Sequence, residues 1–191
     1  ENFPNDKERL PVAHYVRGGP ESEGWTHDED QFLSKKVKDY PLLMQSAVRE
    51  WGHHSGQTDI SLTREIYRVT GPDGYSYSPV WIHPKDAAAR GIQDKDVVKI
   101  VNDRGIVLGA ARVVEKIIPG TVHMDKAGGA DMIDPLGINR GGSPNAIAPQ
   151  GTCSLHAYGL APTAYLVQVA KVTGAEWDEW RKNFPDAFTR Q

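Results

Sequence analysis

The region between residues 80 and 125 alternates between runs of apolar, mostly β-branched residues and short groups of turn-forming residues. Apolar runs of this kind, bounded by turn signals, are typical of buried strands. The predicted strands are 80–82, 97–101, 106–114 and 121–124. Asn102-Asp103-Arg104-Gly105 indicates a hairpin turn before the third strand, and Pro119-Gly120 indicates a turn before the fourth. The pattern therefore predicts a mainly β domain.

A short helix is predicted directly after the first of these strands. Pro84 suits the first helical turn, where a backbone N–H would have no helical partner. The Ala-rich stretch 85–90 favours a helix, and Gly91 is a suitable C-cap. Asp86 falls in the first turn, where its carboxylate is predicted to accept from free backbone N–H groups and to complement the helix dipole. We expect a structural rather than a catalytic role for Asp86.

The flanking segments extend the pattern in both directions. Further strands are predicted over 40–48 and 165–172, short helices over 28–38 and 175–184, and a short helix or turn over 59–69. Trp177 and Trp180 fall on one side of the last helix, where packing is their expected role. Residues 134–150 consist almost entirely of turn-forming residues, which predicts a long loop.

Composition narrows the possible functions. The chain has 191 residues, 39% of them hydrophobic and 25% charged, as in an ordinary globular domain. A net charge of -3 provides no basic field for nucleic acid, and we expect no membrane contact because no apolar run is long enough to span a bilayer. The single cysteine, Cys153, excludes an internal disulfide. With no targeting signal in the chain, we expect a cytoplasmic or periplasmic location.

The order of strand, short helix, hairpin, turn and strand carries a resemblance to a known family. The matching residues are Pro84, Asp86, Ala87, Arg90, Gly91 and Ile92, then Asp96, Val98, Ile100, Asn102, Arg104 and Gly105, then Pro119, Gly120 and Val122. The chain resembles, from about residue 40 to residue 172, the C-terminal molybdopterin-dinucleotide-binding domain of the dimethyl sulfoxide reductase (molybdopterin oxidoreductase) family.

The resemblance implies a fold and a division of the chain. The implied fold is mainly β, a six-stranded double-psi β-barrel of the aspartate-decarboxylase type with short peripheral helices. We expect an N-terminal extension or linker over 1–39, the barrel over 40–173, and a C-terminal helix and tail over 174–191.

The first candidate loop follows the predicted strand 40–48. Ser46, Arg49, His54 and Ser55 fall where the family has its first cofactor-contacting loop. A guanidinium and hydroxyl groups there suit phosphate and pterin heteroatoms. A solvated loop is the alternative. A metal site at the adjacent His53 and His54 is disfavoured, because the sequence offers no partner ligand at suitable spacing.

Two further loops complete the candidate site. Lys126, Gly128 and Gly129 fall in a loop that lies beside the pterin in the family, although Lys126 stands where the family usually has His. Paired glycines permit close approach of backbone to a ligand, and a flexible turn is the alternative. Asn145 resembles the Asn of the family's Asn-x-Leu-Thr element, and its amide both donates and accepts, which suits a guanine or pterin edge.

We expect no catalytic residue and no metal ligand in this chain. Cys153 and His156 form a conceivable nucleophilic pair, but the sequence offers no orienting third group, so an inert thiol is favoured. The family's Cys-x-x-Cys iron–sulfur motif is missing, and no metal-ligating residue is recognisable. These features suggest an excised domain or a small subunit that is not active alone.

The function implied by the resemblance is binding of a bis-molybdopterin guanine dinucleotide cofactor from one side. Its molybdenum or tungsten would be ligated from a part of the enzyme not in this chain, and the redox chemistry would belong to the cofactor. The expected partner is a catalytic body with an iron–sulfur cluster, in the same polypeptide or a separate subunit. The alternative is a cofactor-free double-psi barrel adaptor that recognises proteins.

Overall fold

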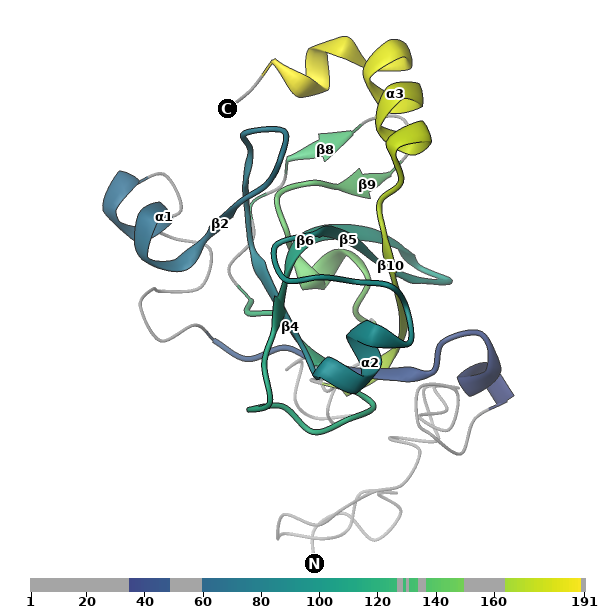
Figure 1. Cartoon of the computed structure of the whole chain (residues 1–191). Coiled ribbons are helices and arrows are strands. Elements are labelled where there is room, and N and C mark those ends of the chain that lie inside the picture. Colours follow the sequence, from purple (N-terminus) through teal and green to yellow (C-terminus); the bar gives the residue numbers. More distant parts are fainter. Residues whose placement is uncertain are drawn as a thin grey trace, which may run out of the picture.

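The computed structural model describes residues 35–48, 60–126, 129, 131–133, 137–149 and 164–189. Strands make up most of the ordered elements, with short helices around them (Figure 1). No helix among the described residues is both long and apolar enough to span a membrane.

Six strands close into a barrel. They are β1 (Leu42–Gln45), β4 (Pro79–Ile82), β5 (Val97–Asn102), β6 (Gly105–Val113), β7 (Thr121–His123) and β10 (Ala164–Lys171). Their order is β4-β7-β1-β10-β5-β6, and a parallel pairing of β6 with β4 closes the ring. The predicted six-stranded double-psi barrel is confirmed.

The β5–β6 hairpin follows the predicted pattern closely. Its register runs from Val97 opposite Ala110 to Asn102 opposite Gly105, so the Asn-Asp-Arg-Gly sequence forms the turn. Buried positions alternate along β5 from Val98 onwards, as expected when one face of a strand meets a core. The side chains inside the barrel form one apolar cluster, which includes Leu42, Met44, Val80, Ile82, Ile100 and Val122.

Gly109 permits the close approach of β6 to β4. A Cβ at this position would lie 2.4 Å from Val80 Cγ2 and 2.9 Å from Ser78 O. No side chain fits at such distances, so glycine is required where the parallel pairing closes the barrel.

The predicted helix after β4 is α2 (Pro84–Ala88), and its details correct one expectation. The cap is His83, whose Nδ1 accepts from the N–H of Lys85 at 3.1 Å. Asp86 does not accept from its own helix. Its Oδ2 accepts from the N–H of Gly120 at 2.7 Å, across the space between α2 and the turn before β7. Asp86 therefore contributes to structure as predicted, through a partner that is distant in sequence.

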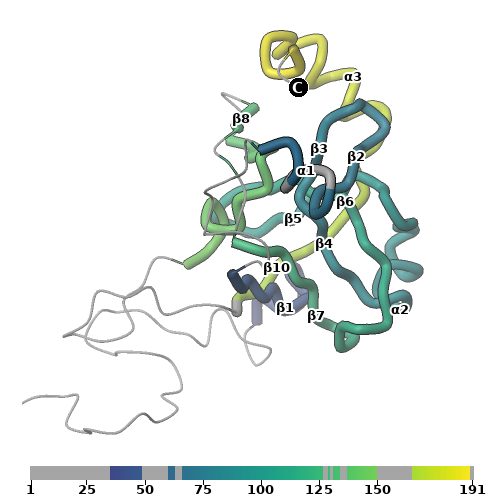
Figure 2. Tube along the Cα trace, turned by 90° about the vertical axis from the view of Figure 1, so that its left-hand side faces the viewer, coloured from purple at the N-terminus to yellow at the C-terminus, as the bar shows by residue number. Residues whose placement is uncertain are grey.

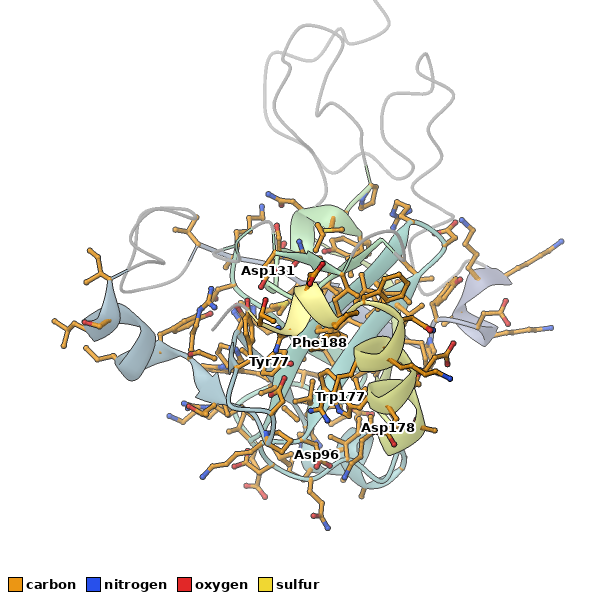
Figure 3. All side chains as sticks on the ribbon, turned by 90° about the horizontal axis from the view of Figure 1, so that it is seen from above. Tyr77, Asp96, Asp131, Trp177, Asp178 and Phe188 are labelled. Atoms are coloured by element: carbon orange, nitrogen blue, oxygen red, sulfur yellow. The ribbon has the colours of Figure 1, made fainter. Side chains whose placement is uncertain are left out.

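The C-terminal helix α3 (Gly174–Asn183) packs on the outside of the barrel. Thr173 and Glu176 form a capping box at its start. Trp177 and Trp180 are buried, with ring centroids 5.4 Å apart, which confirms their predicted packing role. They belong to a second apolar cluster with Tyr77 and the partly buried Phe188 (Figure 3).

The remaining elements are short. They are η3 (Lys35–Lys38), α1 (Ser61–Tyr67), β2 (Val69–Thr70), β3 (Ser76–Tyr77), β8 (Met132–Ile133), β9 (Ile138–Asn139), η4 (Pro144–Ala146) and η5 (Pro185–Phe188). The stretch 134–150, predicted as a loop throughout, contains β9 and η4. β9 forms because it pairs with β6 and β8, a non-local contact that turn-forming residues do not reveal. The predicted domain boundaries at residues 39 and 173 stay predictions.

Candidate functional site

Three strand ends meet at one place on the barrel. β1 runs parallel to β7, with Gln45 opposite His123, and antiparallel to β10, with Gln45 opposite Ala164. The ends of β1 and β7 and the start of β10 are therefore neighbours, as Figure 2 also shows. Residues 46–48 follow β1 at this end, and residues 124–126 follow β7. Both segments precede the predicted cofactor loops.

Hydrogen bonds join the beginnings of the first two candidate loops. The N–H of Lys126 donates to Ala47 O at 2.7 Å, and the N–H of Met124 donates to Gln45 O at 3.1 Å. Ser46, between these acceptors, is 4% exposed, and Lys126 is half-buried. The structure thus brings the predicted residues Ser46 and Lys126 together, although they are 80 positions apart in sequence.

Part of the predicted site falls outside the described residues. This applies to Arg49, His54, Ser55 and Gly128, and also to His53, Cys153 and His156. Their roles stay predictions.

Directly before Lys126 lies a polar cluster, which the sequence analysis did not predict. Asp125 accepts from the hydroxyl of Tyr67, at the end of α1, and its Oδ1 lies 2.6 Å from Nε2 of His123. The His123 ring packs edge-on against Trp81, with centroids 5.7 Å apart. The only sequence signal is the alternation His-x-Asp at the end of a predicted strand. Asp125 ties α1 to the end of β7, directly before the second candidate loop.

Gly129 is held by the end of β9 and the turn that follows it. Nδ2 of Asn139 donates to Gly129 O at 3.3 Å. The N–H groups of Arg140 and Gly141 both donate to Asp131 O, at 2.7 and 3.1 Å. A Cβ on Gly141 would lie 2.3 Å from Gly129 O, so the two backbones are in direct contact. The segment 139–141 therefore contacts both Gly129 and Asp131.

Asn145 lies on η4, which is anchored on both sides. The hydroxyl of Tyr165 donates to Pro144 O at 2.9 Å. Ile147 O accepts from Nδ2 of Asn102 and from Nε of Arg104, both at 2.8 Å. Asn145 itself is exposed. The fold thus presents its amide to solvent from a fixed turn, next to the strand β10 whose start borders the site.

Arg140 anchors a second network, behind the site. It is 2% exposed, its Nη2 lies 3.0 Å from Asp73 Oδ2, and its Nη1 donates to Ala187 O at 2.9 Å. Its guanidinium stacks on the rings of Tyr75, at 3.9 Å, and Phe188, at 4.8 Å. The network connects the loop after β9 with η5 at the C-terminus.

Two tyrosines in this network have altered acidity. Burial, followed by the neighbouring carboxylate of Asp131, raises the pKa of Tyr75 to about 12. The Tyr75 hydroxyl donates to that carboxylate at 2.9 Å. Burial and the hydrogen bond to Asp73 also raise the pKa of Tyr77 above its ordinary value. Both hydroxyls are therefore protonated donors at neutral pH.

No group of three or more His, Cys, Asp or Glu side chains converges as in a metal site among the residues that the structure describes. The structure places the backbone of Lys126 beside Ala47, and the side-chain amide of Asn139 beside Gly129 O.

Comparison with known proteins assigns the chain to a family. The model of the Molydopterin dinucleotide binding domain matches residues 52–159. The chain belongs to this family. The matched stretch includes the predicted residues His54, Ser55, Lys126, Gly128, Gly129 and Asn145, while Ser46 and Arg49 precede it.

Curated relatives support the assignment. The large subunit of pyrogallol hydroxytransferase from Pelobacter acidigallici is 34% identical over 158 residues, which are 78% of this chain. Trimethylamine-N-oxide reductase from Haemophilus influenzae is 33% identical over 154 residues, 77% of this chain. Dimethyl sulfoxide/trimethylamine N-oxide reductase from Cereibacter sphaeroides is 34% identical over 139 residues, 71% of this chain. The recognised family resemblance is confirmed.

The chain spans only a small part of these relatives, 18% of the first two and 16% of the third. Among solved structures, acetylene hydratase from Pelobacter acetylenicus has a similar fold, with a TM-score of 0.57 and 17% identity. That similarity covers 85% of this chain and 21% of the hydratase.

Proposed function

We propose that this chain binds molybdopterin guanine dinucleotide at the end of the barrel where β1, β7 and β10 meet. The observation that carries the proposal is the junction of Ser46 and Lys126, the starts of two loops predicted to contact the cofactor. Membership of the dinucleotide-binding family supplies the class of ligand. The junction supplies a candidate place for it on this barrel.

The chemistry of the donors at this place fits the groups of the cofactor. The Lys126 ammonium and the hydroxyl and guanidinium predicted at Ser46 and Arg49 suit the pyrophosphate. This local charge matters because the chain as a whole carries a net charge of -3. The exposed amide of Asn145 can donate and accept toward the edge of guanine or pterin. When bound, the cofactor supplies the redox chemistry, while these residues hold and orient it.

We further propose that the chain works as part of a larger molybdopterin oxidoreductase, either as a domain of one polypeptide or as a subunit. The matched relatives are about five to six times longer than the stretch they share with this chain, which leaves room for a catalytic body. In this proposal the body carries the iron–sulfur cluster and ligates molybdenum or tungsten, and the isolated chain has no turnover.

A cofactor-free adaptor barrel that recognises proteins is the competing function. The fold alone does not separate the two functions, since it positions loops in either case. The assignment to a dinucleotide-binding family favours the cofactor.

Replacement of Asn145 in the complete protein tests the proposal. Asn145→Ala removes an exposed amide from a turn whose anchors, Tyr165 and Asn102, remain in place. We expect the guanine nucleotide released per folded protein to fall, because loss of one hydrogen bond of about 1 kcal/mol weakens binding about fivefold. The melting temperature should not change.

The matched control is Asn183→Ala, an exposed asparagine at the end of α3. It should leave both the nucleotide content and the melting temperature at wild-type values. Equal nucleotide content in the Asn145 variant and the wild type would remove Asn145 from the site. Absence of guanine nucleotide from the wild-type protein would refute the proposed function itself.

A further inference from the structure

Asn139 lies between two segments that are predicted to contact the cofactor, and it is 3% exposed. Its Nδ2 donates to Gly129 O at 3.3 Å, in the second candidate loop. Its Oδ1 accepts from the N–H of Ser143 at 2.9 Å, directly before the turn that carries Asn145. A single buried amide thus uses its donor on one loop and its acceptor on the other. The Asn side chain carries its donor and its acceptor on separate atoms and is uncharged, so it can serve both loops at once.

Steric contact at the next turn reinforces the same junction. The backbone of Gly141 touches the backbone of Gly129 so closely that a Cβ would lie 2.3 Å from Gly129 O. Asp131 O accepts from the N–H groups of both Arg140 and Gly141. Hydrogen bonds and direct packing therefore hold both Gly129 and Asp131 (labelled in Figure 3) against the segment 139–143.

We propose that Asn139 is a positioning residue that sets the spacing between Gly129 and Asn145 for binding of the dinucleotide. The inference rests on the proposed function and adds a residue that is neither exposed nor among those predicted to touch the cofactor. A ligand that bridges two loops binds more tightly when their separation is fixed in advance, because less conformational freedom is lost on binding. Without Asn139 the loops would keep their donors but lose their fixed separation.

The experiment compares Asn139→Ala with Gly137→Ala by titration of the purified chain with GDP. Gly137, next to β9, has φ of +66°, and a Cβ at this position would meet no atom within 4 Å. Ala there strains the backbone without contacting Gly129. Both variants should lower the melting temperature. We expect about tenfold weaker GDP binding for Asn139→Ala, because this variant loses the fixed separation of the two loops. For Gly137→Ala we expect GDP affinity to change by less than about twofold, because that separation is kept.

Two more variants separate the hydrogen bonds from packing. Asn139→Asp keeps an acceptor for the N–H of Ser143 and loses the donor to Gly129 O. Hydrogen exchange at the Ser143 amide should therefore stay slow in Asn139→Asp and become fast in Asn139→Ala. Gly141→Ala pushes directly on Gly129 O, so it should also weaken GDP binding while Asn139 is intact.

The outcomes distinguish the positioning role from the proposed function. If the wild-type chain binds GDP and Asn139→Ala binds it with the same Kd, the positioning role is wrong while the proposed function stands. If Gly137→Ala weakens binding as much as Asn139→Ala, the effect follows stability and the positioning role is again overturned. If the wild-type chain does not bind GDP, the proposed function fails first, and the role of Asn139 fails with it.

Discussion

Tyr75 shows how a single buried side chain links stability to pH. Its hydroxyl donates to Asp131 and its ring stacks under Arg140, and its pKa is raised to about 12. In the unfolded chain a tyrosine titrates near pH 10. Between these two values the unfolded chain has lost the proton and the folded chain retains it. The stabilising contribution is therefore complete below about pH 10 and is lost as pH rises toward 12.

We expect the free energy of unfolding to decline between about pH 10 and pH 12, and to decline less steeply in Tyr75→Phe, which has no phenol to ionise. Urea unfolding of both proteins at several pH values measures this difference. Tyr40→Phe, at a half-buried residue before β1, is the control and should follow the wild-type profile. Identical pH profiles for Tyr75→Phe and wild type would contradict the assigned shift in the pKa of Tyr75.

The Arg140 network also shows which residue-level features the sequence does not reveal. Arg140 stands in a glycine-rich stretch of turn residues, and its neighbours give no sign that it is buried. Its partners, Asp73 and Ala187, lie 67 and 47 positions away. Burial of this guanidinium depends on the fold that brings three distant segments together, and no local pattern encodes that arrangement.

At the level of elements, α2 and the turn before β7 are joined by one hydrogen bond. Asp86→Ala removes the acceptor of the Gly120 N–H. A hydrogen bond to a charged group contributes about 1.5–3 kcal/mol, so we expect a loss of that order in the free energy of unfolding. GDP affinity should not change, because no predicted cofactor residue contacts Asp86 in the part of the chain that the structure describes. Chemical denaturation and a GDP titration measure the two quantities.

Asp178→Ala is the control for this experiment, since Asp178 is an exposed carboxylate on α3 (Figure 3). Its unfolding free energy should lie within about 0.5 kcal/mol of wild type. Unchanged stability of Asp86→Ala together with weakened nucleotide binding would place Asp86 in the binding site instead.

Local patterns predicted most elements of the barrel, because β-branched runs and turn residues act over a few positions. β5, β6, β7 and α2 agree with the predicted ranges within one or two residues. The two-residue strands β8 and β9 escaped prediction, since they exist only through pairing with each other and with β6. The helix cap at His83 was missed because histidine is an unusual capping residue. The partner of Asp86 was missed because the contact is distant in sequence.

The candidate site required more than local patterns. Ser46 and Lys126 are adjacent only because β1 and β7 run parallel, and strand order cannot be deduced from the apolar runs. The resemblance to a family placed both residues in cofactor-contacting loops, and the register of the barrel brings the two segments side by side. Asn139 carried no sequence signal, because its role depends on which loops lie on either side of its amide.

At the scale of the whole molecule, we propose that this barrel recognises a guanine dinucleotide. The chain has no overall positive charge, and the family match comprises residues 52–159, including two of the three candidate loops in full. In this proposal the whole fold serves to hold short loops in register at one end. GDP carries the guanosine and pyrophosphate groups of the cofactor, so it is sufficient to test recognition by this end alone.

The most direct measurement is a calorimetric titration of the purified chain with GDP and, separately, with ADP. The proposed site predicts saturable binding of one GDP per chain, and at least about tenfold weaker binding of ADP, because the edge of adenine presents a different pattern of donors and acceptors. Saturable binding of neither nucleotide, or equal affinity for both, would contradict recognition of a guanine dinucleotide by this barrel.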